Sequence, residues 1–141
     1  MKTDWERTTP VLVPPLHVME ALVARAEPGQ RVVAIDVLSG GLANTNLRVR
    51  VTDGDRVLRI YQRDPRVQAK EAALAKRLAS VVPVPEWIAA GGAGELLPHP
   101  WALIRWVDGT PMDALAGHAR ELEAAVRSAG EVLARIQAVQ L

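Results

Sequence analysis

The first periodic pattern along the chain is helical. Apolar residues recur at helical spacing between Leu16 and Val23, and Pro28 and Gly29 stop the run. Two prolines precede it, and the first turn of a helix tolerates proline. The pattern predicts an N-terminal helical segment within residues 1–30.

Residues 31–62 have the pattern of three antiparallel strands. A β-branched run at residues 32–38 is followed by strict alternation of apolar and polar positions at residues 47–52. Asp53 and Gly54 then form a dipeptide typical of a tight hairpin, and a further apolar run returns from it. A loop that contains two glycines joins the first two of these strands.

Helical spacing returns after Pro65 and ends at the Pro-Val-Pro sequence of residues 83–85. Two short apolar segments, residues 87–90 and 101–107, are predicted strands, and residues 119–141 form a long helical pattern. The whole pattern predicts an α+β fold. It has an antiparallel sheet of about five strands with a packed helix, an N-terminal helix and a C-terminal helical extension.

Composition narrows the class of protein. The chain has 141 residues, of which 49% are apolar and 23% charged, and its net charge is +1. Such a small charge gives no support for a nucleic-acid or membrane-surface partner. The absence of cysteine excludes disulfides, thiolate metal sites and thiol catalysis. Without a signal-peptide core or a run of about 20 apolar residues, we expect a soluble, cytoplasmic protein.

The glycine-containing loop is the first candidate site. Because glycine has no Cβ, its backbone N–H groups can approach an anion such as a phosphate closely. An ordinary hairpin turn would explain the same glycines. The candidate residues of the loop are Ser39, Gly40, Gly41, Ala43 and Asn44.

A carboxylate on an apolar helix face is the second candidate. Glu71 lies on the apolar face of the helix that follows Pro65. An unpaired buried charge costs several kcal/mol, so we expect a cationic partner, and Arg59 on the preceding strand is the candidate. In the alternative, the helix is rotated, Glu71 is solvated, and Leu58 and Ile60 face the core instead of Arg59.

Two further segments allow either a structural or a functional interpretation. The apolar strand at residues 101–107 ends in a connector whose backbone groups could bond a planar base, but a buried strand and turn explain it equally. Arg48, Arg50 and Arg56 are predicted to form the polar face of the hairpin, where they could attract an anion beside two aspartates. The three histidines, at positions 17, 99 and 118, have no metal-ligand spacing.

Taken in order, these elements resemble a kinase small lobe. The segment at residues 38–78 reads LSGGLANTNLRVRVTDGDRVLRIYQRDPRVQAKEAALAKRL, and VPVPEWI and WALIRWVDGTPM follow it. Together they resemble the aminoglycoside phosphotransferase and choline kinase-like family. The resemblance runs from about Val32 to the end of the chain. It implies a nucleotide-binding lobe at residues 31–107, and a hinge with the first helices of a second lobe at residues 108–141.

For the nucleotide, the resemblance implies the following roles. The loop at residues 39–44 would hold the phosphates of ATP, Arg59 would bridge them, and Glu71 in KEAAL would be the ion-pair partner of Arg59. Ile104 would lie behind the adenine. The backbone carbonyl of Arg105 and the backbone N–H of Val107 would bond the edge of the base. The residues that would line the adenine slot are Leu38, Val49 and Val57.

The catalytic half of the family pattern is missing from this sequence. The family's catalytic loop resembles H-G-D-x-x-x-x-N, followed by a metal-binding Asp, and none of the three histidines begins such a loop. In LARIQAV, Gln137 stands where the family has a histidine. The complete enzyme would use Mg²⁺ and transfer the γ-phosphoryl group of ATP to a small-molecule hydroxyl. We expect this chain to bind nucleotide without turnover; a non-catalytic, kinase-derived binding or interaction module is the alternative.

The last helix carries an apolar stripe at steps of four and three residues. Covering it would contribute roughly 1.5–3 kcal/mol for each large apolar side chain. We expect a missing C-terminal lobe or an oligomer to cover it, unless the helix folds back onto the sheet or the N-terminal helix. The stripe consists of Leu122, Val126, Ala129, Leu133 and Ile136.

Overall fold

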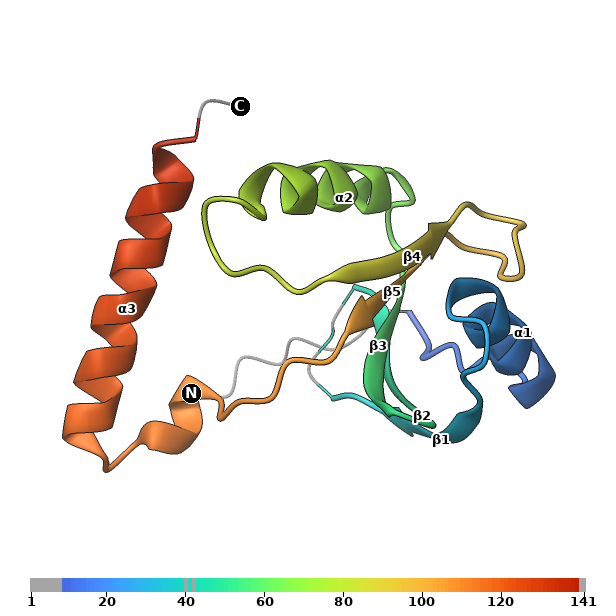
Figure 1. Ribbon diagram of the computed structural model, residues 1–141, viewed down its shortest axis with the longest axis horizontal. Coiled ribbons are helices and arrows are strands. Elements are labelled where there is room, and N and C mark those ends of the chain that lie inside the picture. Colours follow the sequence, from blue (N-terminus) through green and yellow to red (C-terminus); the bar gives the residue numbers. More distant parts are fainter. Residues whose placement is uncertain (1–8, 40, 42, 140–141) are drawn as a thin grey trace. The chain divides into compact units, whose positions relative to one another are not determined.

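The computed structural model describes residues 9–39, 41 and 43–139 of the chain (Figure 1). Within these residues, three α-helices, one 3-10 helix and five strands form, so the predicted α+β fold is confirmed. Their order is α1 (Leu16–Ala26), β1 (Val32–Val37), β2 (Thr45–Val51), β3 (Gly54–Ile60), α2 (Arg66–Leu78), β4 (Trp87–Gly91), β5 (Trp101–Arg105), η1 (Met112–Leu115) and α3 (Ala119–Gln137).

The described strands form one antiparallel sheet in the order β1-β2-β3-β5-β4. The predicted hairpin lies between β2 and β3, where Val51 pairs with Gly54 and residues 52–53 form the loop. Gly54 has a φ of 146°, a backbone conformation that only glycine adopts without strain. β5 inserts beside β3, so the strand that carries Arg59 lies in the middle of the sheet.

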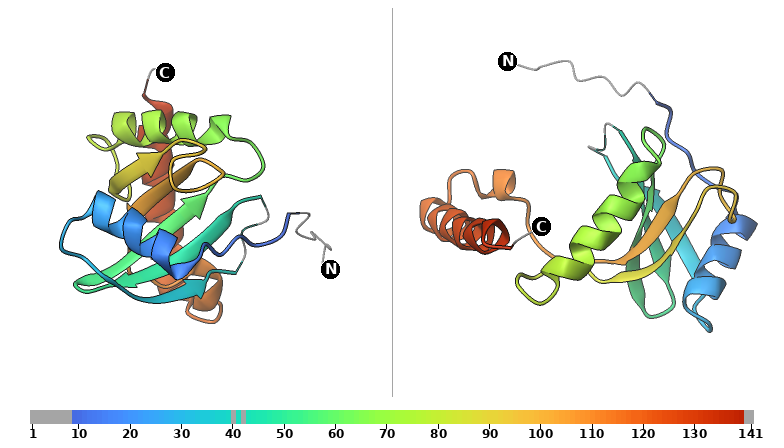
Figure 2. Two further views of the ribbon diagram at one scale, coloured as in Figure 1. Left: turned by 90° about the vertical axis from the view of Figure 1, so that its right-hand side faces the viewer. Right: turned by 90° about the horizontal axis from the view of Figure 1, so that it is seen from above.

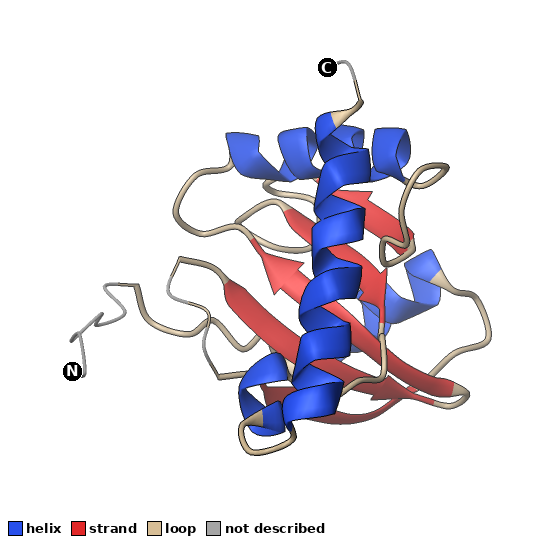
Figure 3. Cartoon of the chain, turned by 90° about the vertical axis from the view of Figure 1, so that its left-hand side faces the viewer, coloured by secondary structure: helices blue, strands red, loops and turns tan. Residues whose placement is uncertain are grey.

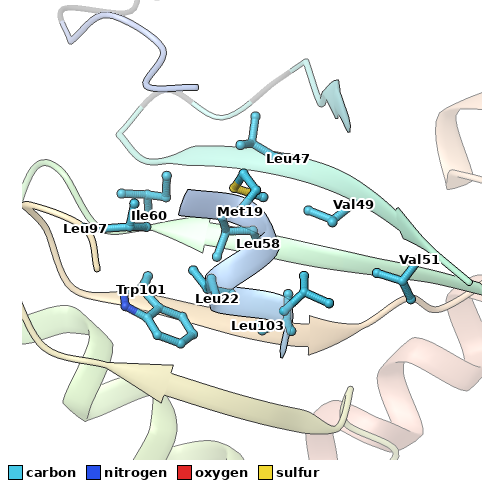
Figure 4. Packing of buried hydrophobic residues seen from close by; sticks show 11 residues of the cluster. Met19, Leu22, Leu47, Val49, Val51, Leu58, Ile60, Leu97, Trp101 and Leu103 are labelled. Atoms are coloured by element: carbon cyan, nitrogen blue, oxygen red, sulfur yellow. The ribbon is translucent and has the colours of Figure 1, made fainter. Parts of the chain in front are cut away.

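One face of the sheet carries the hydrophobic core, which α1 covers (Figures 2 and 4). Met19, Leu22 and Val23 of α1 are fully buried against alternate residues of β2, β3 and β5. Alternation follows from strand geometry, because successive side chains point to opposite faces. The sheet residues of this core are Leu47, Val49, Val51, Leu58, Ile60, Trp101 and Leu103.

The same alternation corrects the adenine slot expected from the sequence. Val49 is fully buried beneath α1, so its assignment to the slot is wrong. Val57 pairs with Arg48 in the β2–β3 register and therefore lies on the opposite face from Val49. Val49 and Val57 cannot line one slot, because the sheet separates them.

The position of Arg56 is a second correction. Arg56 pairs with Val49 in the register, which places it on the core side rather than on a polar face with Arg48 and Arg50. Its side chain is only 3% exposed, and its Nε lies 2.7 Å from a carboxylate oxygen of Glu27, the residue at the C-terminal cap of α1. A second carboxylate, that of Asp53, has an oxygen 2.8 Å from its Nη2.

The chain divides into two compact units. The first comprises residues up to Ala72 and Pro85–Trp106, and the second comprises Ala73–Val84 and Val107–Leu141. In the second unit η1 leads into α3, and both helices are visible in Figure 3. None of the described residues of α3 is buried, and Val126 and Leu133 on the apolar stripe are 55% and 54% exposed. What covers the stripe stays a prediction.

No helix in the part of the chain that the structure describes combines the length and the apolar character needed to cross a membrane.

Candidate functional site

An ion pair joins β3 to α2 on the sheet face opposite α1. The Arg59 Nη1 lies 2.9 Å from Oε2 of Glu71, and each side chain is 36% exposed. The pair expected from the sequence is confirmed, and the alternative in which Glu71 is only solvated is wrong. Leu58 and Ile60 do face the α1 core, as that alternative supposed. Arg59 can contact α2 while Leu58 and Ile60 contact α1, because successive side chains of β3 point to opposite faces of the sheet.

Asp64 fixes the start of α2 and hence the position of Glu71. Its carboxylate accepts hydrogen bonds from the backbone N–H of Arg66 at 3.0 Å and from the guanidinium of Arg66 at 3.0 and 3.1 Å. These hydrogen bonds lower the pKa of the Asp64 carboxyl, so it stays charged at the positive end of the helix. Glu71 lies about one and a half turns after Arg66, the first residue of α2.

Two residues that the sequence analysis did not select complete the cluster. The Arg59 Nε donates to Oδ1 of Asn46 at 3.0 Å, and the Tyr61 hydroxyl donates to Oε2 of Glu71 at 2.7 Å. Asn46 lies directly opposite Arg59 in the β2–β3 register. The result is a hydrogen-bonded chain across two strands and a helix, Asn46–Arg59–Glu71–Tyr61. We call it the Arg59 cluster.

Burial of Tyr61 raises the pKa of its phenol well above the usual 10.0, and its hydrogen bond to the Glu71 carboxylate raises it further. The phenol is fully buried, so ionisation would place a second negative charge beside a carboxylate without solvent. The Tyr61 hydroxyl is therefore a stable donor to Glu71 at any physiological pH.

A pH titration tests this assignment directly, because Tyr61 is the single tyrosine of the chain. We expect no phenolate absorbance from the native protein at about pH 11, whereas the urea-unfolded chain should titrate near pH 10. The raised pKa contributes stability in full below about pH 10, and this contribution is lost as the pH rises further, because only the unfolded chain gives up its proton there. A native midpoint near pH 10 would contradict the buried hydrogen bond. In Glu71→Gln the midpoint should fall but stay elevated, since burial is the larger cause.

The glycine-containing loop ends next to this cluster. Ser39 is exposed, while Gly41, Ala43 and Asn44 are half-buried; Gly40 lies outside the described residues. The loop is closed at its base by a hydrogen bond from the backbone N–H of Leu38 to the carbonyl of Asn46 at 3.0 Å. Asn46 thus contacts both the loop base and Arg59.

Thr45 anchors the exit of the loop. It is fully buried, its hydroxyl donates to Oε1 of Gln62 at 2.6 Å, and it accepts from the backbone N–H of Leu12 at 3.0 Å. These hydrogen bonds fix the C-terminal end of the loop beside Gln62, which follows β3.

The expected adenine contacts lie along β5. Ile104 pairs with Val57 in the register and shares the face of Arg59, where it is half-buried. Arg105 ends β5, and its Nε lies 2.6 Å from Glu86. Val107 belongs to the second unit and is 65% exposed. The contacts of Arg105 and Val107 with a base edge stay predictions, as do the ligand contacts of the loop.

The remaining arginines of this face are paired. The Arg48 Nε donates to Asp55 at 2.9 Å, and its guanidinium lies 4.4 Å from the centre of the Trp106 ring. Arg50 pairs with Asp36 at 2.8 Å. The carboxylates offset the charge of the hairpin arginines, so a general attraction of anions to this face is weak.

No group of three acidic or histidine side chains that could hold a metal ion occurs in the portion of the chain described.

The comparison with known protein families gives a match over most of the chain. The family model described as the phosphotransferase enzyme family matches residues 34–141. No curated protein and no solved structure matches the chain.

Proposed function

The chain belongs to the phosphotransferase enzyme family, and from that premise we propose that its first unit binds ATP on the sheet face opposite α1. Transfer of the γ-phosphoryl group of ATP to the hydroxyl of a small molecule would require the H-G-D-x-x-x-x-N pattern, which this sequence lacks. The triphosphate would lie between the loop at residues 39–44 and Arg59, with the adenine along Ile104 toward residues 105–107.

The observation that supports this proposal is the state of Arg59. Its guanidinium uses Nε for Asn46 and one Nη1 hydrogen for Glu71. The guanidinium also interacts with the Tyr61 hydroxyl, and the Arg59 side chain is 36% exposed. A planar guanidinium that is held at Nε and Nη1 and stays partly exposed suits the oxygen atoms of a phosphate chain. Phosphoryl transfer depends chiefly on such positioning and charge stabilisation.

Mg²⁺ would accompany ATP, and no ligand for it is assigned among the residues described. The sequence lacks the H-G-D-x-x-x-x-N pattern. We therefore expect nucleotide binding without turnover.

Replacing Arg59 by alanine tests the proposal. A hydrogen bond to a charged group contributes about 1.5–3 kcal/mol, so Arg59→Ala should weaken ATP binding roughly 10- to 100-fold. Adenosine has no phosphate, and its affinity should change less than about twofold. Isothermal titration calorimetry of both ligands measures the difference.

Arg50→Ala is the matched control, because Arg50 is also an ion-paired arginine of the sheet but lies opposite Asp55 near the hairpin turn, four residues along β2 from Asn46. It should leave both affinities close to those of the unsubstituted chain. Equal losses for ATP and adenosine in Arg59→Ala would refute the phosphate role, and no binding of ATP at all would refute the proposed function.

A further inference from the structure

The Arg59 guanidinium is held at two of its nitrogens, Nε and Nη1. Nε donates to Oδ1 of Asn46 at 3.0 Å and Nη1 donates to Oε2 of Glu71 at 2.9 Å. A bond through Nη1 alone would leave the planar group free to rotate about that contact. The second bond, through Nε, fixes the plane and therefore fixes where the remaining donors point.

We infer that Asn46 and Tyr61 are positioning residues that set the orientation of the Arg59 fork toward the phosphates of the nucleotide. This inference rests on the proposed function. Asn46 acts on Arg59 directly. Tyr61 acts through Glu71, because its hydroxyl donates to the same oxygen, Oε2, that accepts from Arg59.

The surroundings of the two residues agree with this role. Tyr61 is fully buried, so its hydroxyl has a fixed position from which to hold the Glu71 carboxylate. Asn46 is a β2 residue two positions after the end of the glycine-containing loop, and its carbonyl also closes the base of that loop. Asn46 therefore contacts both the base of the glycine-containing loop and Arg59, the two groups that would bind the phosphates.

A purely structural role for Asn46 predicts something different. The backbone ladder between β2 and β3 runs from Thr45 to Val51 and does not depend on the Asn46 side chain. If the side chain only joined the two strands, its loss would lower stability and affect every ligand equally. If Asn46 positions Arg59, its loss should weaken binding of ATP but not of adenosine. The effect should also require the guanidinium of Arg59, since lysine has no Nε–H with which to reach Asn46.

The test is a double-mutant cycle on the full chain, with calorimetric affinities for ATP and adenosine. In the chain that retains Arg59, Asn46→Ala should weaken ATP binding about 5- to 10-fold and leave adenosine within about twofold. In the Arg59→Lys background, the same change should alter ATP binding less than about twofold. Tyr61→Phe removes only the hydroxyl and should weaken ATP binding in the same direction as Asn46→Ala.

Gln68→Ala is the control for a structural loss, because the Gln68 amide donates to the backbone carbonyls of Gly91 and Trp101 rather than to the Arg59 cluster. It should change stability and leave the ratio of ATP to adenosine affinities unchanged.

A second measurement does not need the nucleotide. In the ligand-free chain, the Arg59 Nε–H proton should exchange slowly with water, and Asn46→Ala should accelerate that exchange at least several-fold.

Two results would overturn the inference. One is an equal effect of Asn46→Ala on ATP binding with and without Arg59→Lys, and the other is an unchanged exchange rate of the Arg59 Nε–H in Asn46→Ala. If ATP binding responds to Arg59→Ala but not to Asn46→Ala, only the inference is wrong. If the unsubstituted chain does not bind ATP, the proposed function is wrong and the inference falls with it.

Discussion

Replacing Arg56 by alanine should lower the free energy of unfolding by about 3–5 kcal/mol, the usual effect of breaking a buried ion pair. Arg56 is 3% exposed and bonds Glu27 through Nε and Nη2, at 2.7 and 2.9 Å. Without it, the Glu27 carboxylate, 18% exposed, keeps only the longer contact with Arg105, whose Nη2 lies 4.0 Å from Oε1. The hydrogen bonding to Glu27 also raises the pKa of Arg56, so the guanidinium stays charged over the accessible pH range.

Three variants separate the causes, with urea unfolding as the measurement. Arg56→Met keeps much of the packing of the stem and isolates the loss of charge. The double variant Arg56→Met with Glu27→Leu removes both charges and should recover much of the loss. Arg50→Ala breaks an exposed pair, 50% exposed on each side, and should cost less than about 1 kcal/mol. If Arg56→Ala costs no more than Arg50→Ala, the buried pair does not hold α1 to the hairpin.

Trp101→Ala should lower the free energy of unfolding by about 3–5 kcal/mol as well, through loss of core packing. The Trp101 ring is 1% exposed, and its Nε1 donates to the backbone carbonyl of Glu95 at 2.9 Å. It lies over Gly91, its partner in the β4–β5 register. A Cβ added to Gly91 would lie 2.5 Å from Cε2 and from Nε1 of that ring.

This contact predicts a strong interaction between two substitutions. Gly91→Ala alone should cost about 1–3 kcal/mol, because the ring and the Cβ cannot share the space. In the Trp101→Ala background the space is open, so Gly91→Ala should add little. Chemical unfolding of the two single variants and the double variant gives the cycle. If the losses in free energy of unfolding are additive, the Trp101 ring is not the reason that glycine is required at position 91. Gly92→Ala is a control, since its Cβ would meet only the carboxylate end of Glu95, at 3.2 Å.

The elements themselves could be predicted from the sequence because each has a local signal. Apolar spacing, prolines and the Asp-Gly dipeptide place the helices, strands and hairpin within a few residues of their bounds. The Arg59–Glu71 pair could also be predicted, because a carboxylate on an apolar helix face requires a cation.

The errors share one cause, the assignment of residues to the two faces of the sheet. The residue pattern assigns Arg56 to the polar face of the hairpin, and the family resemblance implies that Val49 lines the adenine slot. Their register positions, opposite each other, put both on the side of α1. Alternation fixes relative faces within a strand, but which face a helix covers depends on contacts between distant segments, such as that of Arg56 with Glu27.

Asn46 and Tyr61 escaped prediction for a related reason. Neither residue has a local signal, because an asparagine in a strand and an aromatic residue after one are both ordinary. Their significance comes from partners that the register and the start of α2 bring to them. A register derived from the hairpin turn would have placed Asn46 opposite Arg59, so that part of the site was within reach of the sequence.

The strand order has a kinetic consequence. β2 and β3 are joined by a two-residue loop, so their hairpin requires little loop closure and belongs to the fast events of folding. β5 returns to β3 only after α2 and β4 have intervened in the chain, and pairings of such long sequence separation form slowly. Asn46 and Arg59 face each other within the hairpin. Their contact can therefore form early, before the sheet has closed around the arginine.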